Sequence, residues 1–279
     1  MPLYLRPGSL DEALGALAAG SLTVVSGGTD FYPARVGRPL DDDVMDISRL
    51  AGLRGISETA SGWRIGALAT WTDVIERPLP ALFDALKQAA REVGGMQIQN
   101  RGTVAGNLCN ASPAADGVPP LMAMDATVEL ASASGTRALR LDAFITGNRR
   151  TVRRTDEIVT AILVPKPAAA ASSAFLKLGA RRYLVISIAM VAAVAERAHD
   201  GTAAAVRVAV GSCSEVARRL PALEAALVGR DMTRLGETVA PGHLAPLSPI
   251  DDVRGSGAYR RDAALTLVRR ALDALGRAA

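Results

Sequence analysis

Alternating apolar and polar positions in the first 55 residues predict short strands around one helix. Ser9 and Glu12 match the capping-box pattern that opens a helix. This helix is expected over Leu10–Ala19 and to end at Gly20. Apolar extended runs predict strands at Leu3–Arg6, Leu22–Val25 and Val44–Ile47. Because parallel strands need a crossover such as a helix, residues 1–55 are expected to form a small βαβ subdomain.

Residues 56–168 change to a mixed pattern of strands and short helices. Strands are predicted at Trp63–Ala69, Thr127–Leu130, Ala138–Leu141 and Glu157–Val164. One helix is expected after a cap formed by Thr70 and Asp73, and another over Leu82–Val93. The second and third strands flank the sequence SASGTR, which predicts a hairpin. A mixed or antiparallel α+β subdomain is expected here, and both subdomains together form a first domain over residues 1–168.

The run PKPAAAASS marks the boundary to a second domain, expected over residues 172–279. Three antiparallel strands are predicted at Ala174–Leu178, Ile186–Ala195 and Ala203–Val210. Helices are predicted to follow at Val216–Val228 and Arg260–Leu275. The fold class expected for the whole chain is therefore α+β, with a three-stranded antiparallel sheet and helices at the C-terminal end.

Two segments that are poor in large side chains carry the candidate chemistry. The first is VVSGGTD, Val24–Asp30, and the second runs over Met96–Ala126 and is expected to be a long loop. Long loops inside a domain are usually functional. Small side chains let a ligand approach the backbone, whose N–H groups can converge on an anion. Thr103 and Asn107 add side-chain donors, and Asp116 offers an acceptor suited to a ribose hydroxyl or a ring N–H.

Each segment alone is also compatible with a tight turn, but two of them could clamp one diphosphate from opposite sides. The sequence SGGTD lacks the lysine of a P-loop, and no GxGxxG pattern precedes a helix, so a Rossmann site is disfavoured. Asp30 has two possible roles, capping a following helix or contacting the ligand. The residues therefore indicate a phosphate-bearing ligand held by two loops.

Composition narrows the possible functions. The chain has 22% charged residues and a formal net charge of +4. Its arginines are expected to be mostly solvated surface, with a few in ligand or subunit contacts. They are not interleaved with aromatic residues, so nucleic acid is not an expected partner. Two cysteines and two histidines show no metal-ligand spacing, so no metal site is expected. An organic cofactor would have to supply any difficult chemistry.

The chain shows no targeting or membrane signal. No apolar run approaches the ~20 residues that a membrane-spanning helix needs. The first residues, MPLYLRPGSL, lack the basic and apolar regions of a signal peptide. A cytoplasmic location without a membrane span is therefore expected.

The sequences SGGTDFYPAR and IQNRGTVAGNLCNASPAAD resemble the flavin-binding subunit of the molybdenum hydroxylases, a family that includes xanthine dehydrogenase and carbon monoxide dehydrogenase. IGALATWTDV resembles the strand and helix between these motifs. FLKLGARRYLVISIAMVAA and IDDVRGSGAYRRDAALTLVRRAL resemble the family's C-terminal domain. The resemblance extends over most of the chain, in the same order and with the same spacing.

The resemblance implies a PCMH-type FAD-binding fold with FAD extended between the two N-terminal subdomains. It implies that Asp116 holds polar groups of FAD and that Ile186 packs near the isoalloxazine ring. The remaining cofactor-binding residues implied in the two motifs are Val25, Ser26, Gly27, Gly28, Thr29, Asp30, Phe31, Thr103, Val104, Ala105, Gly106 and Asn107.

The same resemblance implies an oxidoreductase: the FAD-binding electron-transfer subunit of a hetero-oligomer. The partners would be an iron–sulfur small subunit and a molybdopterin large subunit, arranged as a dimer of heterotrimers. Electrons would pass through FAD to NAD⁺, oxygen or another acceptor. Two alternatives stay open: a stand-alone flavin-dependent reductase of the same fold, and a non-redox nucleotide-binding assembly module.

Ala105 and the cysteines of this chain can be compared with the family pattern. The family usually has two glycines where this chain has Ala105-Gly106. The extra methyl group costs ~1 kcal/mol if φ at Ala105 is positive and little if φ is negative. Cys109 is expected to be a small packing residue near the flavin rather than a redox thiol. Two cysteines are also too few for the additional iron–sulfur cluster found in the benzoyl-CoA-type branch of the family.

Overall fold

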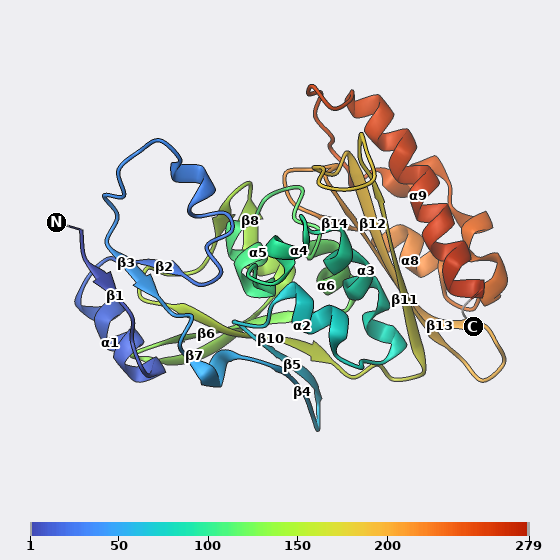
Figure 1. Cartoon of the computed structure of the whole chain (residues 1–279). Coiled ribbons are helices and arrows are strands. Elements are labelled where there is room, and N and C mark those ends of the chain that lie inside the picture. Colours follow the sequence, from blue (N-terminus) through green and yellow to red (C-terminus); the bar gives the residue numbers. More distant parts are fainter. Residues whose placement is uncertain (1, 278–279) are drawn as a thin grey trace.

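The computed structural model describes residues 2–277 and begins with a small parallel sheet (Figure 1). Strands β1 (Tyr4–Leu5), β2 (Thr23–Val25) and β3 (Val44–Asp46) lie in the order β1-β3-β2, all parallel. Helix α1 (Leu10–Ala19) connects the first two strands, and Ser9 accepts a hydrogen bond from the Glu12 amide at 3.1 Å. The predicted βαβ unit and its capped helix are confirmed.

A five-stranded antiparallel sheet follows. Its strands, in the order in which they lie, are β4 (Ile56–Thr59), β5 (Gly62–Gly66), β10 (Ile158–Pro165), β6 (Thr127–Ser132) and β7 (Gly135–Arg140). The predicted hairpin is β6–β7, closed by the pair Ser132 and Gly135. Leu14 and Leu17 of α1 belong to the same buried cluster as Ala131 and Ile158 of this sheet. The two N-terminal subdomains are therefore joined by an apolar contact.

Six short α-helices lie within residues 71–144, and three of them are in the segment that was expected to be a long loop. The helices are α2 (Trp71–Glu76), α3 (Asp84–Glu92), α4 (Met96–Gln99), α5 (Val104–Asn110), α6 (Val118–Ala123) and α7 (Leu141–Phe144). The prediction of a loop over Met96–Ala126 was wrong because Thr103 caps α5, accepting from the Gly106 amide at 3.0 Å. Pro119 and Pro120 lie in the first turn of α6, where proline costs no helical hydrogen bond.

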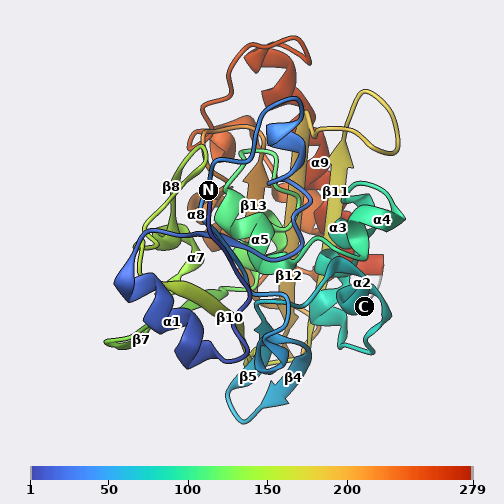
Figure 2. The ribbon, with the colours of Figure 1, turned by 60° about the vertical axis from the view of Figure 1, so that its left-hand side comes forward.

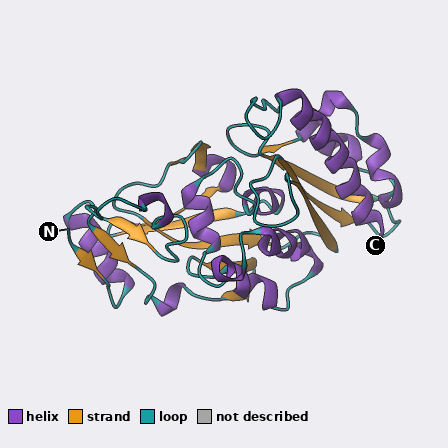
Figure 3. Ribbon diagram, turned by 45° about the horizontal axis from the view of Figure 1, so that its top comes forward, coloured by secondary structure: helices purple, strands orange, loops and turns teal. Residues whose placement is uncertain are grey.

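The C-terminal sheet is packed on both faces. Strands β11 (Ala171–Leu178), β12 (Ala189–Arg197), β13 (Ala203–Gly211) and the short edge strand β14 (Arg218–Arg219) form it in this order. The three predicted strands are confirmed, and the two-residue β14 adds a fourth. Helices α8 (Pro221–Leu227) and α9 (Gly257–Arg277) cover the outer face (Figure 3). Short 3₁₀ helices lie at Pro33–Arg35, Ala51–Leu53, Ala81–Phe83, Met232–Thr238 and Pro241–Leu244.

Strand β12 shows why the second domain is fixed to the first. Val191 and Ala193 belong to the buried cluster that includes α9, whereas Met190, Ala192 and Val194 belong to the cluster of the N-terminal domain. Alternate residues of a strand point to opposite faces, so this strand contributes to both cores. The small side chains of β12 let both layers approach closely.

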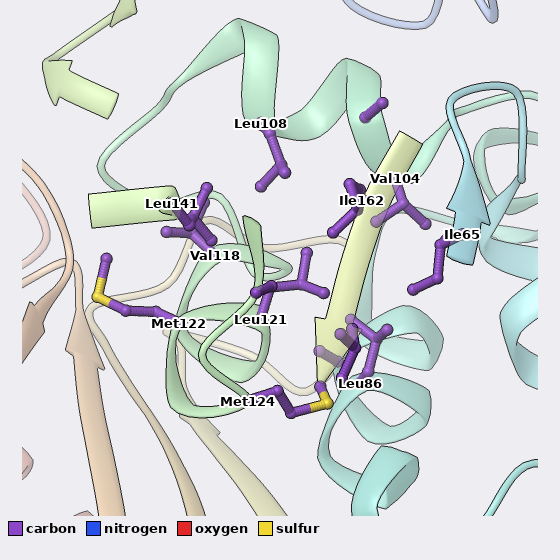
Figure 4. Close-up of a cluster of buried hydrophobic side chains, with 14 of the residues drawn as sticks. Ile65, Leu86, Val104, Leu108, Val118, Leu121, Met122, Met124, Leu141 and Ile162 are labelled. Atoms are coloured by element: carbon purple, nitrogen blue, oxygen red, sulfur yellow. The ribbon is translucent and has the colours of Figure 1, made fainter. Parts of the chain in front are cut away.

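The larger core lies between α5, α6 and β10 (Figure 4). Leu108 of α5, Leu121 of α6 and Ile162 of β10 are fully buried there. Val104, one of the residues predicted to bind the cofactor, also points into this core. The cluster fixes the helix that carries the second glycine-bearing motif.

Replacing Leu121 by alanine should lower the free energy of unfolding by about 2–5 kcal/mol, because it leaves a cavity in a closely packed core. The control is Val36→Ala at a side chain that is 83% exposed, where a change within about 0.5 kcal/mol is expected. Urea denaturation measures both. Equal effects at the two positions would contradict the assignment of this core.

Candidate functional site

A cavity of about 910 Å³ lies where the two glycine-bearing segments meet. The segment after β2 and the start of α5 form two of its walls. The hairpin β8 (Ile145–Gly147) and β9 (Arg150–Thr151), together with the first residues of β10, lies across from them. The predicted residues that line this cavity are Val25, Ser26, Gly27, Gly28, Thr29, Asp30, Phe31, Thr103, Ala105, Gly106 and Asn107.

The two segments touch directly at the cavity. A Cβ atom added to Gly27 would lie 1.9 Å from the carbonyl oxygen of Arg101, closer than any real contact. The hydroxyl groups of Ser26 and Thr103 are 3.2 Å apart and share a hydrogen bond. Gly28 has a φ of 69°, and a Cβ there would lie 2.6 Å from the Tyr32 ring. Positions 27 and 28 carry glycine because the backbone of Arg101 and the ring of Tyr32 occupy the space that a side chain would need.

The backbone of the first segment presents a row of free donors. Within residues 2–277, the N–H groups of Gly27–Phe31 find no protein acceptor, and neither does that of Ala105. Successive unpaired amides in a turn form an anion-binding concavity. Ala105 lies inside α5 without a positive φ, so its methyl group does not strain the backbone. These donors fit the diphosphate of a dinucleotide.

Arginines also line the cavity. Arg149 donates from Nη1 to Asp30 at 3.2 Å and to the Asn110 side-chain oxygen at 2.6 Å, which ties the hairpin to both segments. Asp30 therefore forms an ion pair and does not cap the following 3₁₀ helix, which begins after Tyr32. Sequence reasoning missed Arg149, Arg150 and Arg153 as cavity residues. The feature of the sequence that could have indicated them is the cluster of three arginines within residues 149–153.

Two more of the predicted residues lie outside the described cavity lining, as Val104 does. Ile186 is 53% exposed, on the segment between β11 and β12. Asp116 is buried, and its carboxylate accepts from Lys177 Nζ at 2.7 Å and from Ser187 Oγ at 2.7 Å. Burial raises the pKa of Asp116, and the positive charge of Lys177 opposes that shift. Sequence reasoning could not pair Asp116 with Lys177, because the partners are 61 positions apart.

The buried group of Asp116, Lys177 and Ser187 is connected to the residues that line the cavity. Asn107, which lines the cavity, accepts a hydrogen bond from the Gly117 amide at 3.2 Å. Lys177 also donates to the carbonyl oxygen of Glu92, at the end of α3, at 3.4 Å. The buried pair therefore holds α3, β11 and the segment after α5 together behind the cavity.

Cys109 borders the cavity as a packing residue. Its side chain packs against the main core, and burial raises its pKa to about 11. The sulfur is a neutral thiol near pH 7. The predicted packing role is confirmed by its contact with the core, and the absence of a redox role stays a prediction. Within residues 2–277, no group of three His, Cys, Asp or Glu side chains could hold a metal ion.

The fold is α+β, and one cavity is lined by both glycine-bearing segments and their unpaired backbone amides. The family described as "FAD binding domain in molybdopterin dehydrogenase" matches residues 1–167, and "CO dehydrogenase flavoprotein C-terminal domain" matches residues 174–275. The chain belongs to this family of FAD-binding oxidoreductase subunits of the molybdenum hydroxylases, and FAD is its cofactor.

Relatives support the same assignment. The "Nicotinate dehydrogenase FAD-subunit" of Eubacterium barkeri is 38% identical over 66% of this chain and 65% of its own length. The "Glyceraldehyde dehydrogenase medium chain" of Sulfolobus acidocaldarius is 30% identical over 96% of both chains. A solved carbon monoxide dehydrogenase from Hydrogenophaga pseudoflava is 30% identical, with a TM-score of 0.86 over 98% of this chain and 96% of that one.

Within residues 2–277, no helix combines the length and the apolar character that crossing a membrane requires.

Replacing Gly27 by alanine should weaken FAD binding by about 10- to 100-fold. The new methyl group forces the two segments apart, and losing one amide contact to a charged phosphate costs about 1.5–3 kcal/mol. Titration of the FAD-free protein with FAD, followed by flavin fluorescence, measures this loss.

The matched control is Gly15→Ala in α1, where an added Cβ meets nothing within 4 Å. It should leave FAD affinity unchanged and stabilise the helix slightly. An unchanged FAD affinity in Gly27→Ala would contradict the cradle.

Replacing Lys177 by alanine should lower the free energy of unfolding by about 3–5 kcal/mol, because it leaves Asp116 buried without its cation. The control is Lys166→Ala, which removes a pair to Glu58 between largely exposed side chains. That change should cost at most about 1 kcal/mol. Similar denaturation midpoints for the two variants would contradict a structural role for the buried pair.

Proposed function

We propose that this chain is the electron-transfer subunit of a multi-subunit molybdenum hydroxylase. Electrons would arrive from iron–sulfur clusters of a partner subunit and leave through FAD to NAD⁺, oxygen or another acceptor. The observation that carries the proposal is the run of unpaired amides at Gly27–Phe31, in a segment that lines one cavity together with the start of α5. This arrangement suits a dinucleotide better than a single small substrate.

The chain's own residues would bind and orient the cofactor. The amides of Gly27–Phe31 and Ala105 would donate to the diphosphate, and the hydroxyl groups of Ser26 and Thr103 border the same place. Arg149 and Arg153, which line the same cavity, would add positive charge for binding the diphosphate. Bound FAD supplies the capacity to accept and release electrons, and the protein supplies position and electrostatics.

Two residues outside the cavity lining remain part of the proposal. Asp116 uses one hydrogen bond at each carboxylate oxygen, and a carboxylate has further acceptor capacity for a polar group of FAD. The half-exposed side chain of Ile186 offers apolar surface against which the isoalloxazine ring would pack.

We infer the partner subunits of this chain from the way its relatives are described. Relatives are described as the "medium chain" of a carbon monoxide dehydrogenase and the "medium subunit" of a nicotine 6-hydroxylase. We propose an iron–sulfur small subunit and a molybdopterin large subunit for this chain, assembled as a dimer of heterotrimers.

Affinity purification of the tagged chain from its native host tests the proposal. A small iron–sulfur subunit and a large molybdopterin subunit should co-purify with it, and the FAD should bleach when the large subunit turns over its substrate. NAD⁺, oxygen and a quinone analogue are then offered separately, and the acceptor that restores the flavin absorbance fastest is assigned as the preferred one. A chain that purifies alone with FAD and reduces a substrate by itself would contradict the proposal.

A further inference from the structure

The segment between β11 and β12, residues 179–188, reaches out of the C-terminal sheet as an exposed loop (gold in Figures 1 and 2). Tyr183, Leu184 and Ile186 are each more than half exposed. Leu184 has a φ of 51°, an unusual conformation for a bulky residue, and Arg181 donates to its carbonyl oxygen. A loop of this shape needs anchors at its ends if it is to keep one position.

Its C-terminal end is held by two buried interactions. Ser187, which is 1% exposed, donates to Asp116 at 2.7 Å. The carbonyl oxygen of the next residue, Ile188, accepts from Arg260 Nη1 at 2.6 Å. Ile186 therefore lies directly beside the anchored residues.

Arg260 lies in the first turns of α9 and is 3% exposed. Its Nη1 also donates to the carbonyl oxygen of Ser212 at 3.1 Å, and its Nη2 donates to Asp252 at 2.7 Å. Burying a guanidinium group is costly unless it is paired. The planar fork of arginine allows it to hold several acceptors in a fixed geometry, which a lysine cannot do.

A second connection runs from Arg260 toward the cradle. Ser212, whose φ is 60°, donates from its amide to the carbonyl oxygen of Pro113 at 3.0 Å. Pro113 lies between α5 and α6, in the second glycine-bearing segment. Arg260 thus binds two carbonyl groups, and each belongs to a turn that is hydrogen-bonded to the segment behind the cavity.

We propose that Arg260 is a positioning residue for the flavin. It fixes Ile188 against Ser212, and thereby sets the place of Ile186 relative to residues 113–116. The proposal rests on the proposed function for one point, the placement of the isoalloxazine ring beside Ile186. Arg260 itself lies outside the described cavity lining, so it acts through these two turns.

The test compares Arg260→Gln, Arg260→Lys and Arg207→Gln in the isolated full chain loaded with FAD. Arg207 is a matched control because it is another mostly buried arginine that donates to a carbonyl group and a carboxylate, at Ala123 and Glu196. Unlike Arg260 it joins the two domains directly, and within residues 2–277 it makes no hydrogen bond or ion pair to residues 179–188 or to Ser212. The readouts are the visible circular dichroism of bound FAD, the dissociation constant for FAD and the thermal midpoint.

Arg260→Gln should change the flavin dichroism and raise the dissociation constant about 2- to 30-fold, the range of coupling through a packed network. Arg260→Lys should fall between Arg260→Gln and wild type. Arg207→Gln should lower the thermal midpoint and leave the flavin signal unchanged. If Arg260→Gln does not fold, Arg260→Lys decides the question by the same signal.

Wild-type dichroism and affinity in both Arg260 variants would overturn the proposal. Equal changes in Arg207→Gln would overturn it as well, because general loosening would then explain them. The measurement uses no partner subunit. A wild-type complex that fails to reduce FAD would therefore contradict the proposed function and leave the Arg260 result standing.

Discussion

The close approach of Gly27 to the backbone of Arg101 is the constraint on which the cradle depends. Only a hydrogen atom fits there, since a Cβ would meet the Arg101 carbonyl oxygen at 1.9 Å. This approach brings the amides after β2 to the same cavity as the start of α5. The two segments belong to different subdomains, so the binding surface exists only when both subdomains are packed together.

Three buried apolar clusters support that packing. The apolar contact between α1 and the five-stranded sheet joins the N-terminal subdomains. Strand β12 contributes alternate side chains to two clusters and so fixes the C-terminal domain to the first. The buried pair of Lys177 and Asp116 adds a polar link between these domains. These contacts together fix the positions of the two glycine-bearing segments relative to each other.

Helices and strands were predicted correctly where a few neighbouring residues determine them. Ser9 and Thr70 accept the predicted capping bonds, and the hairpin and the long C-terminal helix are present. The helices within Met96–Ala126 were not predicted, because glycines, prolines and small polar residues masked a helical start that Thr103 caps. The fourth strand of the C-terminal sheet has two residues, too few for a periodic pattern.

The glycine-bearing halves of the candidate site could also be found from the sequence, because bare backbone is visible as a run of small residues. The arginines that line the cavity, Arg149, Arg150 and Arg153, form a visible cluster in the sequence, but a cluster of arginines looks the same on a solvated surface as beside a ligand. Val104 shares its motif with cavity residues yet faces the core, because successive positions of a helix point in different directions. The pairing of Asp116 with Lys177 depends on tertiary packing that no local pattern encodes.

Amide hydrogen exchange with and without FAD tests the central claim most directly. A diphosphate held between the two segments predicts slower exchange on FAD addition at residues 27–31 and at residue 105 together. Protection in only one of these segments, or at neither, would contradict the account.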